Sequence, residues 1–229
     1  MQRSKIEWTE YTSNPIRGRC LHACSYCYAE QIRIKYKQPA GMHWHPEELI
    51  KIRGKKKAAT IFIGSMYDIF GEWVEGGYID QILDTAKACP QHTFLFLTKN
   101  PVKVSRFDFS DNCWVGVTDD CMGSDTYPLD DFGEWITGTN KFISFEPLLG
   151  ALGTQIPSDI SQIIIGAMTG KGGKVIKPEI KWVTDIIDAA GDRPIYIKDN
   201  LLDILPEALR GYYSTTRLRR LEWRLNDWS

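Results

Sequence analysis

Three cysteines in one short segment, GRCLHACSYCYAE (residues 18–30), have the clearest potential for chemistry in this chain. Cys20, Cys24 and Cys27 are spaced Cys-x3-Cys-x2-Cys. Thiolates are soft ligands that select zinc, copper(I) or iron–sulfur clusters. Three thiols are one short of the four ligands that a structural zinc site or an iron–sulfur cluster normally has. The segment therefore predicts a metal centre whose fourth position is filled by another group.

Two kinds of metal centre fit these cysteines. In a zinc site, His43 or His45 would complete a Cys3His set, and His22 lies among the cysteines themselves. The protein would then be a zinc-binding, non-catalytic nucleic-acid module that uses Cys20, Cys24, Cys27 and a histidine. In a [4Fe–4S] cluster held by three cysteines, one iron keeps an open coordination position, which is what chemistry at the metal requires.

Seven apolar segments indicate the strands that would position this loop. Six are continuous in apolar residues, which is typical of strands buried on both faces of a parallel sheet, and the first alternates only loosely. They are residues 5–11, Thr60–Ser65, Thr93–Thr98, Cys113–Thr118, Lys141–Glu146, Gln162–Ala167 and Pro194–Asp199. Helical patterns lie between several of them, at Tyr28–Tyr36, Tyr78–Cys89 and Pro178–Gly191, with an interrupted one at 123–138.

This alternation of strands and helices predicts an α/β fold with a parallel sheet. A full eight-unit barrel takes about 250 residues, and the chain has 229. We therefore expect a partial (β/α) barrel of six or seven parallel strands, with a doubly wound open sheet as the alternative. It would form a single domain over residues 1–229, with its core at about 5–200 and a C-terminal cap at 201–229. In both folds, functional groups gather at the carboxyl ends of the strands.

The cysteine segment resembles the cluster motif of the radical S-adenosylmethionine (radical SAM) superfamily, Cys-x3-Cys-x-aromatic-Cys, with Tyr26 as the aromatic residue. The resemblance implies a [4Fe–4S] cluster on Cys20, Cys24 and Cys27, whose open iron chelates S-adenosylmethionine (AdoMet). In that superfamily the reduced cluster cleaves AdoMet to methionine and a 5′-deoxyadenosyl radical, which abstracts hydrogen from a substrate. It further implies an external electron donor of the flavodoxin or ferredoxin type.

A narrower resemblance extends over most of the chain. The segments SKIEWTEYTSNP, CYAE, FIGSMYDIFGEWV, FLTKNP, WVGVT and FISFEPLLG are similar to a phage-associated family of radical-SAM-like proteins of unknown function. That family is itself similar to spore photoproduct lyase. The resemblance implies an enzyme acting on a small molecule or nucleotide, and a nucleotide or nucleic-acid base is the favoured substrate class.

The resemblance also assigns AdoMet contacts to residues at the strand ends. These are an aromatic ring near the adenine, polar groups on the amino group and on the ribose, and backbone along the adenine edge. Tyr26 is the ring near the adenine, and Ser65 and Asp68 are the groups on the amino group. Thr118 and Asp119 are the groups on the ribose, and the backbone along the adenine edge belongs to the segment that ends at Met168. The superfamily's usual glutamate is absent from the segment 64–68, so Ser65 and Asp68 are substitutes by position.

Three further residues are candidates for catalysis. Lys99 would hold the AdoMet carboxylate or a substrate anion, and Glu146 would bind ribose or act as a general base. Alternatively, Lys99 and Glu146 form a structural ion pair in the barrel mouth. Lys198 is a similar candidate for a substrate phosphate. Cys121 would donate a hydrogen atom, a role that spore photoproduct lyase gives to a cysteine.

Composition limits the partners. A net charge of −1 argues against general binding to nucleic acid or membrane surfaces by bulk charge. Two basic segments, 51–60 with five Lys or Arg residues and 215–228 with four Arg residues, leave nucleic acid open as a partner. No apolar run approaches the roughly 20 residues of a membrane helix, and the N-terminus lacks the apolar stretch of a secretory signal. We therefore expect a cytoplasmic protein without membrane contact.

Overall fold

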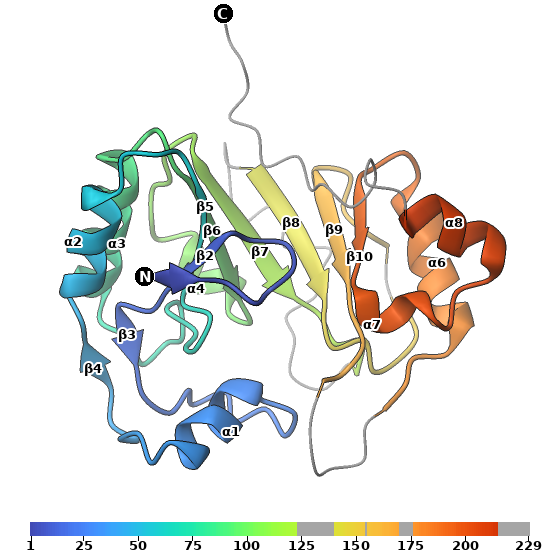
Figure 1. The fold of residues 1–229 in the computed structure, drawn as a ribbon, viewed down its shortest axis with the longest axis horizontal. Helices are drawn as coiled ribbons and strands as arrows, with labels where there is room; N and C mark the ends of the chain where they lie inside the picture. Colours follow the sequence, from blue (N-terminus) through green and yellow to red (C-terminus); the bar gives the residue numbers. More distant parts are fainter. Residues whose placement is uncertain (123–139, 154, 170–175, 215–229) are drawn as a thin grey trace, which may run out of the picture.

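The central feature of the fold is an eight-stranded sheet in the order β1-β2-β5-β6-β7-β8-β9-β10. The computed structural model describes residues 1–122, 140–153, 155–169 and 176–214. Neighbouring strands from β2 to β10 are parallel, and β1 is antiparallel to β2. The two edge strands, β1 and β10, do not pair with each other within the described residues, so the barrel is partial (Figure 1).

The bounds of the elements follow the chain in a regular alternation. The strands of the large sheet are β1 (Gln2–Arg3), β2 (Tyr11–Ser13), β5 (Thr60–Ile63), β6 (Thr93–Thr98), β7 (Cys113–Thr118), β8 (Asn140–Phe145), β9 (Gln162–Ile165) and β10 (Ile195–Ile197). A second sheet pairs β3 (Ile16–Arg17) with β4 (His43–Trp44). The helices are α1 (Tyr28–Lys35), α2 (Glu47–Gly54), α3 (Gly76–Lys87), α4 (Pro101–Val104), α6 (Ile180–Ala190), α7 (Asp199–Leu202) and α8 (Glu207–Ser214).

The expected α/β partial barrel of six or seven parallel strands is confirmed, with seven parallel strands from β2 to β10. The prediction for the first strand is wrong in its bounds. Residues 4–10 form a loop that is closed by a hydrogen bond from the Ser4 N–H to the Glu10 carbonyl (2.9 Å). The strand itself is β2, which starts only at Tyr11. The loose alternation of residues 5–11 therefore belongs to a loop, which is hereafter called the N-terminal loop.

One large side chain from each of six strands, together with Trp8, fills the inner face of the sheet. These side chains are Phe62, Leu95, Trp114, Phe142, Ile164 and Tyr196. The Trp8 ring lies 4.8 Å from the Phe62 ring, measured between centroids. Glu7 in the same loop accepts hydrogen bonds from the Tyr196 hydroxyl (3.2 Å) and the Asp199 N–H (3.0 Å). The N-terminal loop thus reaches from β2 to β10, across the inner face.

The outer face of the sheet packs against the helices. Alternate strand side chains such as Ile63, Phe96 and Val117 join a larger core cluster with residues of α3 and α6. Burial on both faces explains the unbroken apolar runs of these strands. Figure 1 shows α2 and α3 beside one part of the sheet and α6 and α8 beyond β10.

Some expectations fall partly or wholly outside the described residues. The interrupted helical pattern at 123–138 and the basic segment at 215–228 both lie there, and of the expected C-terminal cap only α7 and α8 are described. In the described part of the chain, no helix combines the length and the apolar character needed to span a membrane.

Candidate active site

The loop that carries the three cysteines lies at the carboxyl ends of the parallel strands, next to α1 (Figure 1). The loop starts at Gly18, whose backbone passes close to that of Gly41: a Cβ on Gly18 would lie 2.5 Å from the Gly41 carbonyl oxygen. Gly18 also has a φ of +142°, which favours glycine. The Arg19 N–H donates to the Ala40 carbonyl (2.9 Å). Ala23, between the first two cysteines, has the left-handed φ of 51°. A tight turn therefore brings the cysteines back toward one another.

The three thiols line a single pocket, which we call the cysteine pocket. It has about 430 Å³ of empty space, part of it open to solvent. Its other lining residues are Gly18, Arg19, Ala23, Ala29, Glu30 and Met66. Cys27 is the N-cap of α1, and its sulfur accepts the Glu30 N–H (3.4 Å). The helix thus begins directly at the third cysteine.

The histidines that would complete a zinc site are engaged elsewhere or lie apart from this pocket. The His22 Nε2 is 2.8 Å from Asp68 Oδ2, and the His45 Nδ1 is 2.8 Å from Glu47 Oε1. His43 is exposed in β4, and none of these three residues lines the cysteine pocket. The pocket's donor set of three thiols therefore fits a three-cysteine cluster better than a Cys3His zinc site.

The protonation of the thiols is set mainly by burial. Burial raises the pKa of Cys20 to about 11, with backbone hydrogen bonds from Asp68 and His22 acting against it. Burial also raises the pKa of Cys24, while the nearby Lys99 charge lowers it. Across the described residues, no three His, Cys, Asp or Glu side chains already stand as a ligand set. A metal centre in this pocket would therefore draw the thiols together and displace their protons.

Asp68 connects the cysteine loop to two strand ends. Its carboxylate accepts the Thr98 hydroxyl (2.8 Å to Oδ1), the Lys99 N–H (2.9 Å to Oδ2) and the Phe70 N–H (3.0 Å to Oδ1), in addition to its contact with His22. The side chain is only 8% exposed. Its acceptor positions are thus taken up by groups of the chain itself, which suits a residue that positions the loop.

Lys99 forms an ion pair, and its partner is Asp120. The Lys99 Nζ lies 3.0 Å from Asp120 Oδ2, and the same oxygen accepts the Tyr26 hydroxyl at 2.5 Å. Nζ also lies 5.3 Å from the centroid of the Tyr26 ring. Burial disfavours the charged carboxylate, but the hydrogen bonds from Tyr26 and Lys99 outweigh it and hold the pKa of Asp120 below its usual range. This cluster brings Tyr26 of the cysteine loop onto the ends of β6 and β7.

Glu146 forms the second ion pair of the barrel mouth, with Lys198. Lys198 is 12% exposed and Glu146 is 23% exposed, so the pair is largely withdrawn from water. Gly166 leaves room for it, because a Cβ there would lie 2.8 Å from the Lys198 Cδ and 3.1 Å from the Glu146 Cδ. Lys99 and Glu146 are therefore both ion-paired, but with Asp120 and Lys198 rather than with each other.

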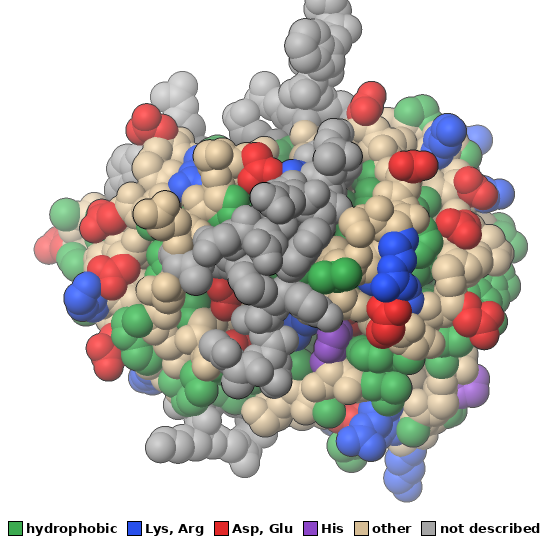
Figure 2. Space-filling model, turned by 180° about the vertical axis from the view of Figure 1, so that it is seen from behind, with side chains coloured by type: hydrophobic (Ala, Val, Ile, Leu, Met, Phe, Trp, Pro, Cys, Tyr) green, Lys and Arg blue, Asp and Glu red, His purple; other side chains and the backbone are tan. Residues whose placement is uncertain are grey.

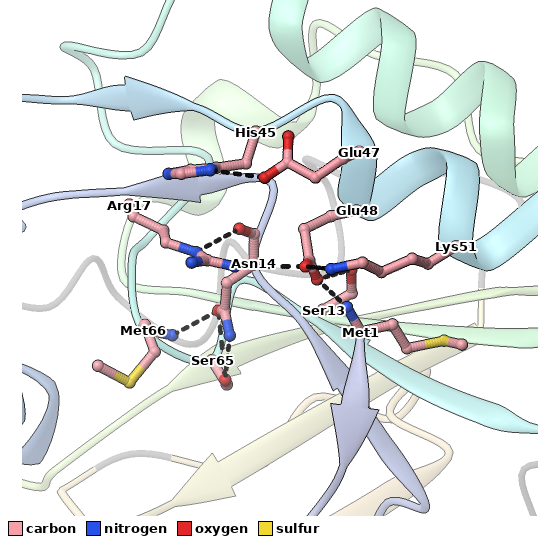
Figure 3. Close-up of polar contacts among 10 residues, drawn as sticks. All are labelled: Met1, Ser13, Asn14, Arg17, His45, Glu47, Glu48, Lys51, Ser65 and Met66. Atoms are coloured by element: carbon pink, nitrogen blue, oxygen red, sulfur yellow. Dashed lines mark hydrogen bonds and ion pairs between the residues drawn. The ribbon is translucent and has the colours of Figure 1, made fainter.

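Ser65 follows β5 and is held by Asn14, which follows β2 (Figure 3). The two side chains exchange hydrogen bonds of 3.2 and 3.3 Å, and Asn14 Oδ1 also accepts the Met66 N–H (2.9 Å). The Tyr28 hydroxyl of α1 donates to the Ser65 carbonyl. Ser65 thus lies where the cysteine loop meets the ends of the first two parallel strands.

The remaining predicted residues lie at the ends of β7 and β9. Thr118 is buried at the end of β7 and is the register partner of Ser144 in β8. Asp119 accepts the Cys121 N–H (2.7 Å), and burial raises its pKa. Cys121 has a φ of 58°, and burial raises its thiol pKa to about 12. Met168 is half-buried after β9.

Asp120 is the main site residue that our sequence interpretation missed. The segment T-D-D places Asp120 two residues after Thr118, and alternation along a strand directs residues i and i+2 to the same side. That rule favours Asp120 over Asp119 as the residue that meets Lys99. Glu7 was also missed, because its partners lie almost 200 residues away in the chain.

The basic segment at residues 51–60 lies at the amino end of β5, away from the site. Three of its cations have structural contacts. Arg53 donates to Thr85 Oγ1 (2.9 Å), and the Lys55 Nζ lies 4.5 Å from the centroid of the Tyr11 ring. Lys51 contacts Glu48 (2.8 Å). Much of this charge therefore serves the local fold.

The model of a family described as "Protein of unknown function (DUF5131)" matches residues 3–197. The chain belongs to this family. The match covers the cysteine loop and every strand of the large sheet except the first residue of β1, so the site lies within the DUF5131 region. No curated protein matches the chain.

The fold of this DUF5131 protein is similar to that of a spore photoproduct lyase mutant, which was solved with bound AdoMet and a dinucleoside spore photoproduct. The TM-score is 0.54 at 10% sequence identity. The similar region covers 86% of this chain and 57% of the lyase, so the DUF5131 chain spans little more than half of the lyase's length. At this identity the likeness establishes the shared partial-barrel fold.

Proposed function

We propose that this protein is a radical SAM enzyme that binds a [4Fe–4S] cluster and AdoMet and acts on a nucleotide or nucleic-acid base. The observation that carries the proposal is the cysteine pocket. Its three thiols have the superfamily's spacing and lie together at the carboxyl ends of a parallel partial barrel. When bound, the cluster would supply the electron that cleaves AdoMet reductively and generates a 5′-deoxyadenosyl radical.

The residues of the chain have distinct parts in this proposal. Cys20, Cys24 and Cys27 would hold the cluster, and with only three protein ligands one iron would stay free to bind AdoMet. The AdoMet-contacting set would be Tyr26, Ser65, Thr118, Asp119 and Met168. Asp68 acts mainly through His22 and the backbone of Lys99, because these groups already fill its acceptor positions.

The two ion pairs of the barrel mouth provide charged groups for ligands. Lys99 can turn from Asp120 to a ligand carboxylate, and the Tyr26 hydroxyl then keeps Asp120 hydrogen-bonded. Glu146 and Lys198 together offer an acceptor and a donor, which suits the ribose hydroxyls and phosphate of a nucleotide. A protonated Cys121 thiol can give its S–H hydrogen atom to a substrate radical and become a thiyl radical. Burial keeps that proton in place at neutral pH.

The nucleotide class rests on two supports. The neighbour of similar fold was solved with a dinucleoside spore photoproduct, and the barrel mouth of this chain carries both cations and carboxylates. The zinc-module alternative has less support, because no histidine lines the cysteine pocket.

Anaerobic purification followed by metal analysis and an AdoMet cleavage assay tests the proposal. We expect brown protein with about four irons per chain, which forms 5′-deoxyadenosine when dithionite and AdoMet are added. Cys24→Ala should lose the iron and form at least 100-fold less 5′-deoxyadenosine than the parent. Cys89→Ala, at a buried cysteine beyond the end of α3, is the matched control and should retain both. Colourless protein with one zinc would overturn the proposal and favour the zinc module.

A further inference from the structure

The surface around α1 is unusual in combining exposed apolar and basic side chains. Leu21, Ile34 and Tyr36 are 59%, 61% and 64% exposed. Residues 17–37 hold five basic residues and one acidic residue, a net charge of +4 in a chain whose net charge is −1. We define the α1 face as Arg19, Leu21, Ile34, Lys35, Tyr36 and Lys37. Figure 2 shows basic and apolar side chains side by side at the lower edge of the molecule, the end where Figure 1 places α1.

The α1 face lies on the outer side of the cysteine pocket. Arg19 and Glu30 line the pocket, and α1 starts at its third cysteine. The inner side of the same loop is turned to the barrel, because Tyr26 contacts Asp120 and Tyr28 contacts the Ser65 carbonyl. The loop therefore separates the barrel mouth, where AdoMet and substrate would bind, from a solvent-facing surface close to the thiols.

We propose that the α1 face is the docking surface for an acidic one-electron carrier protein of the flavodoxin class. This inference rests on the proposed function. Each reductive cleavage of AdoMet takes up one electron: the carrier loses it, the sulfonium gains it, and the C5′–S bond breaks to give methionine and the 5′-deoxyadenosyl radical. A cluster held by Cys20, Cys24 and Cys27 would have to be reduced before each cleavage, and under the proposed function that electron comes from another molecule. That molecule has to approach where the pocket meets the surface.

The chemistry of the α1 face matches such a carrier. Opposite charges on two proteins accelerate their encounter and fix their orientation, and the cations here surround exposed apolar side chains that can form the dry centre of an interface. A nucleic acid is also acidic, but its bases would need to reach the inner side of the loop, where the chemistry takes place. Exposed aliphatic side chains such as Leu21 and Ile34 also suit a protein surface better than a phosphate backbone.

A double charge reversal, Lys35→Glu with Lys37→Glu, tests the proposal. Both side chains are exposed, so the variant should fold like the parent. The matched control, Lys56→Glu with Lys57→Glu, makes the same charge change at exposed positions before β5, at the other end of the sheet. Two properties are measured for each protein. One is the Kd for oxidised flavodoxin by titration calorimetry, and the other is 5′-deoxyadenosine formation with either reduced flavodoxin or dithionite.

The α1-face variant should bind flavodoxin at least tenfold more weakly at low salt, and this difference should shrink at 0.5 M salt because screening weakens charge pairs. Its product formation should fall about tenfold with flavodoxin and stay unchanged with dithionite, which needs no docking surface. A second variant, Ile34→Ser, should weaken binding without this salt dependence.

An unchanged Kd in the α1-face variant, or an equal loss in the control variant, would overturn the docking proposal. It would also be overturned if the variant lost affinity for a single-stranded DNA oligonucleotide while flavodoxin binding and flavodoxin-driven turnover stayed intact. A failure of every protein, the parent included, to form product with dithionite would sink the proposed function instead. The calorimetric titration would still decide whether the α1 face binds the carrier.

Discussion

Helices α1 and α3 both follow loops at the carboxyl ends of strands, but they are held in place in different ways. Helix α3 has 12 residues and buries five of them, Ile79, Ile82, Leu83, Thr85 and Ala86. Helix α1 has eight residues and buries only Ala29. An eight-residue helix is too short to be stable in water on its own, so α1 depends on contacts at its ends.

Those end contacts of α1 are polar. Cys27 caps its first turn, and Arg33 donates to Glu30 (2.7 Å) and to the Gln38 carbonyl (2.9 Å). Polar contacts of this kind, at or near the surface, contribute little each. The comparison teaches that the sheet and α3 form the stable scaffold, whereas the segment bearing the thiols belongs to the less stable part of the molecule, where ligand binding can order it.

The largest expected effect is on stability, and it separates the two helices directly. Ile82→Ala in α3 removes a side chain that is 1% exposed and should cost about 2–5 kcal/mol of unfolding free energy. Ile34→Ala in α1 removes an exposed side chain and should change it by less than about 0.5 kcal/mol. Urea denaturation measures both. Similar losses for the two variants would mean that α1 packs as tightly as α3.

A smaller effect concerns Glu48 of α2, which ties the scaffold to the chain entering the cysteine loop (Figure 3). It accepts hydrogen bonds from Ser13 in β2 (3.0 Å), from Arg17 in β3 (3.3 Å) and from Lys51 (2.8 Å), and it pairs with the Met1 amine. Burial opposes its ionisation, but Lys51 and the amine outweigh burial and lower its pKa to about 2. Glu48→Gln should therefore cost about 2–3 kcal/mol at pH 7.

The pH dependence of that loss has a definite sign. Because folding lowers the pKa of Glu48, its contribution is complete above the ordinary value near 4.5 and disappears as the pH falls toward 2. The denaturation midpoints of Glu48→Gln and the parent should thus converge between pH 4.5 and 2. Glu47→Gln, at the exposed neighbour, is the control and should change stability far less than Glu48→Gln, because its contact with His45 lies at the surface. A pH-independent gap would show that packing, not charge, makes Glu48 stabilising.

The scaffold could be predicted from sequence more fully than the site, for a physical reason. Strands such as Phe94–Phe96 are buried on both faces, and their unbroken apolar runs reveal this directly. The α6 helix shows the same clarity, because its buried residues Val183 and Ile186 recur at helical spacing. In these segments a local pattern records burial, and burial determines the structure.

The partners of the site residues could not be predicted in this way. Lys99 and Asp120 are 21 residues apart, and Glu146 and Lys198 are 52 apart. A repeating pattern of apolar residues shows which side chains are buried, but it does not show which distant residues the curvature of the sheet brings together. The N-terminal loop was misread for a related reason, since Trp8 is buried by packing across the inner face rather than by a place in a strand.

The smallest expected effect is local and concerns the link between the cysteine pocket and α1. Loading the protein with iron and sulfide should slow amide hydrogen exchange in Tyr28–Lys35 by about tenfold, because ligation of Cys27 would fix the first turn of the helix. Exchange in Gly76–Lys87 should stay the same, since the core already holds α3. Hydrogen-exchange mass spectrometry measures both segments in one experiment. Cys24→Ala treated in the same way should show no protection of α1. If the loaded parent also leaves α1 unprotected, the helix is ordered by protein contacts alone, and the contrast between the two helices lies only in their burial.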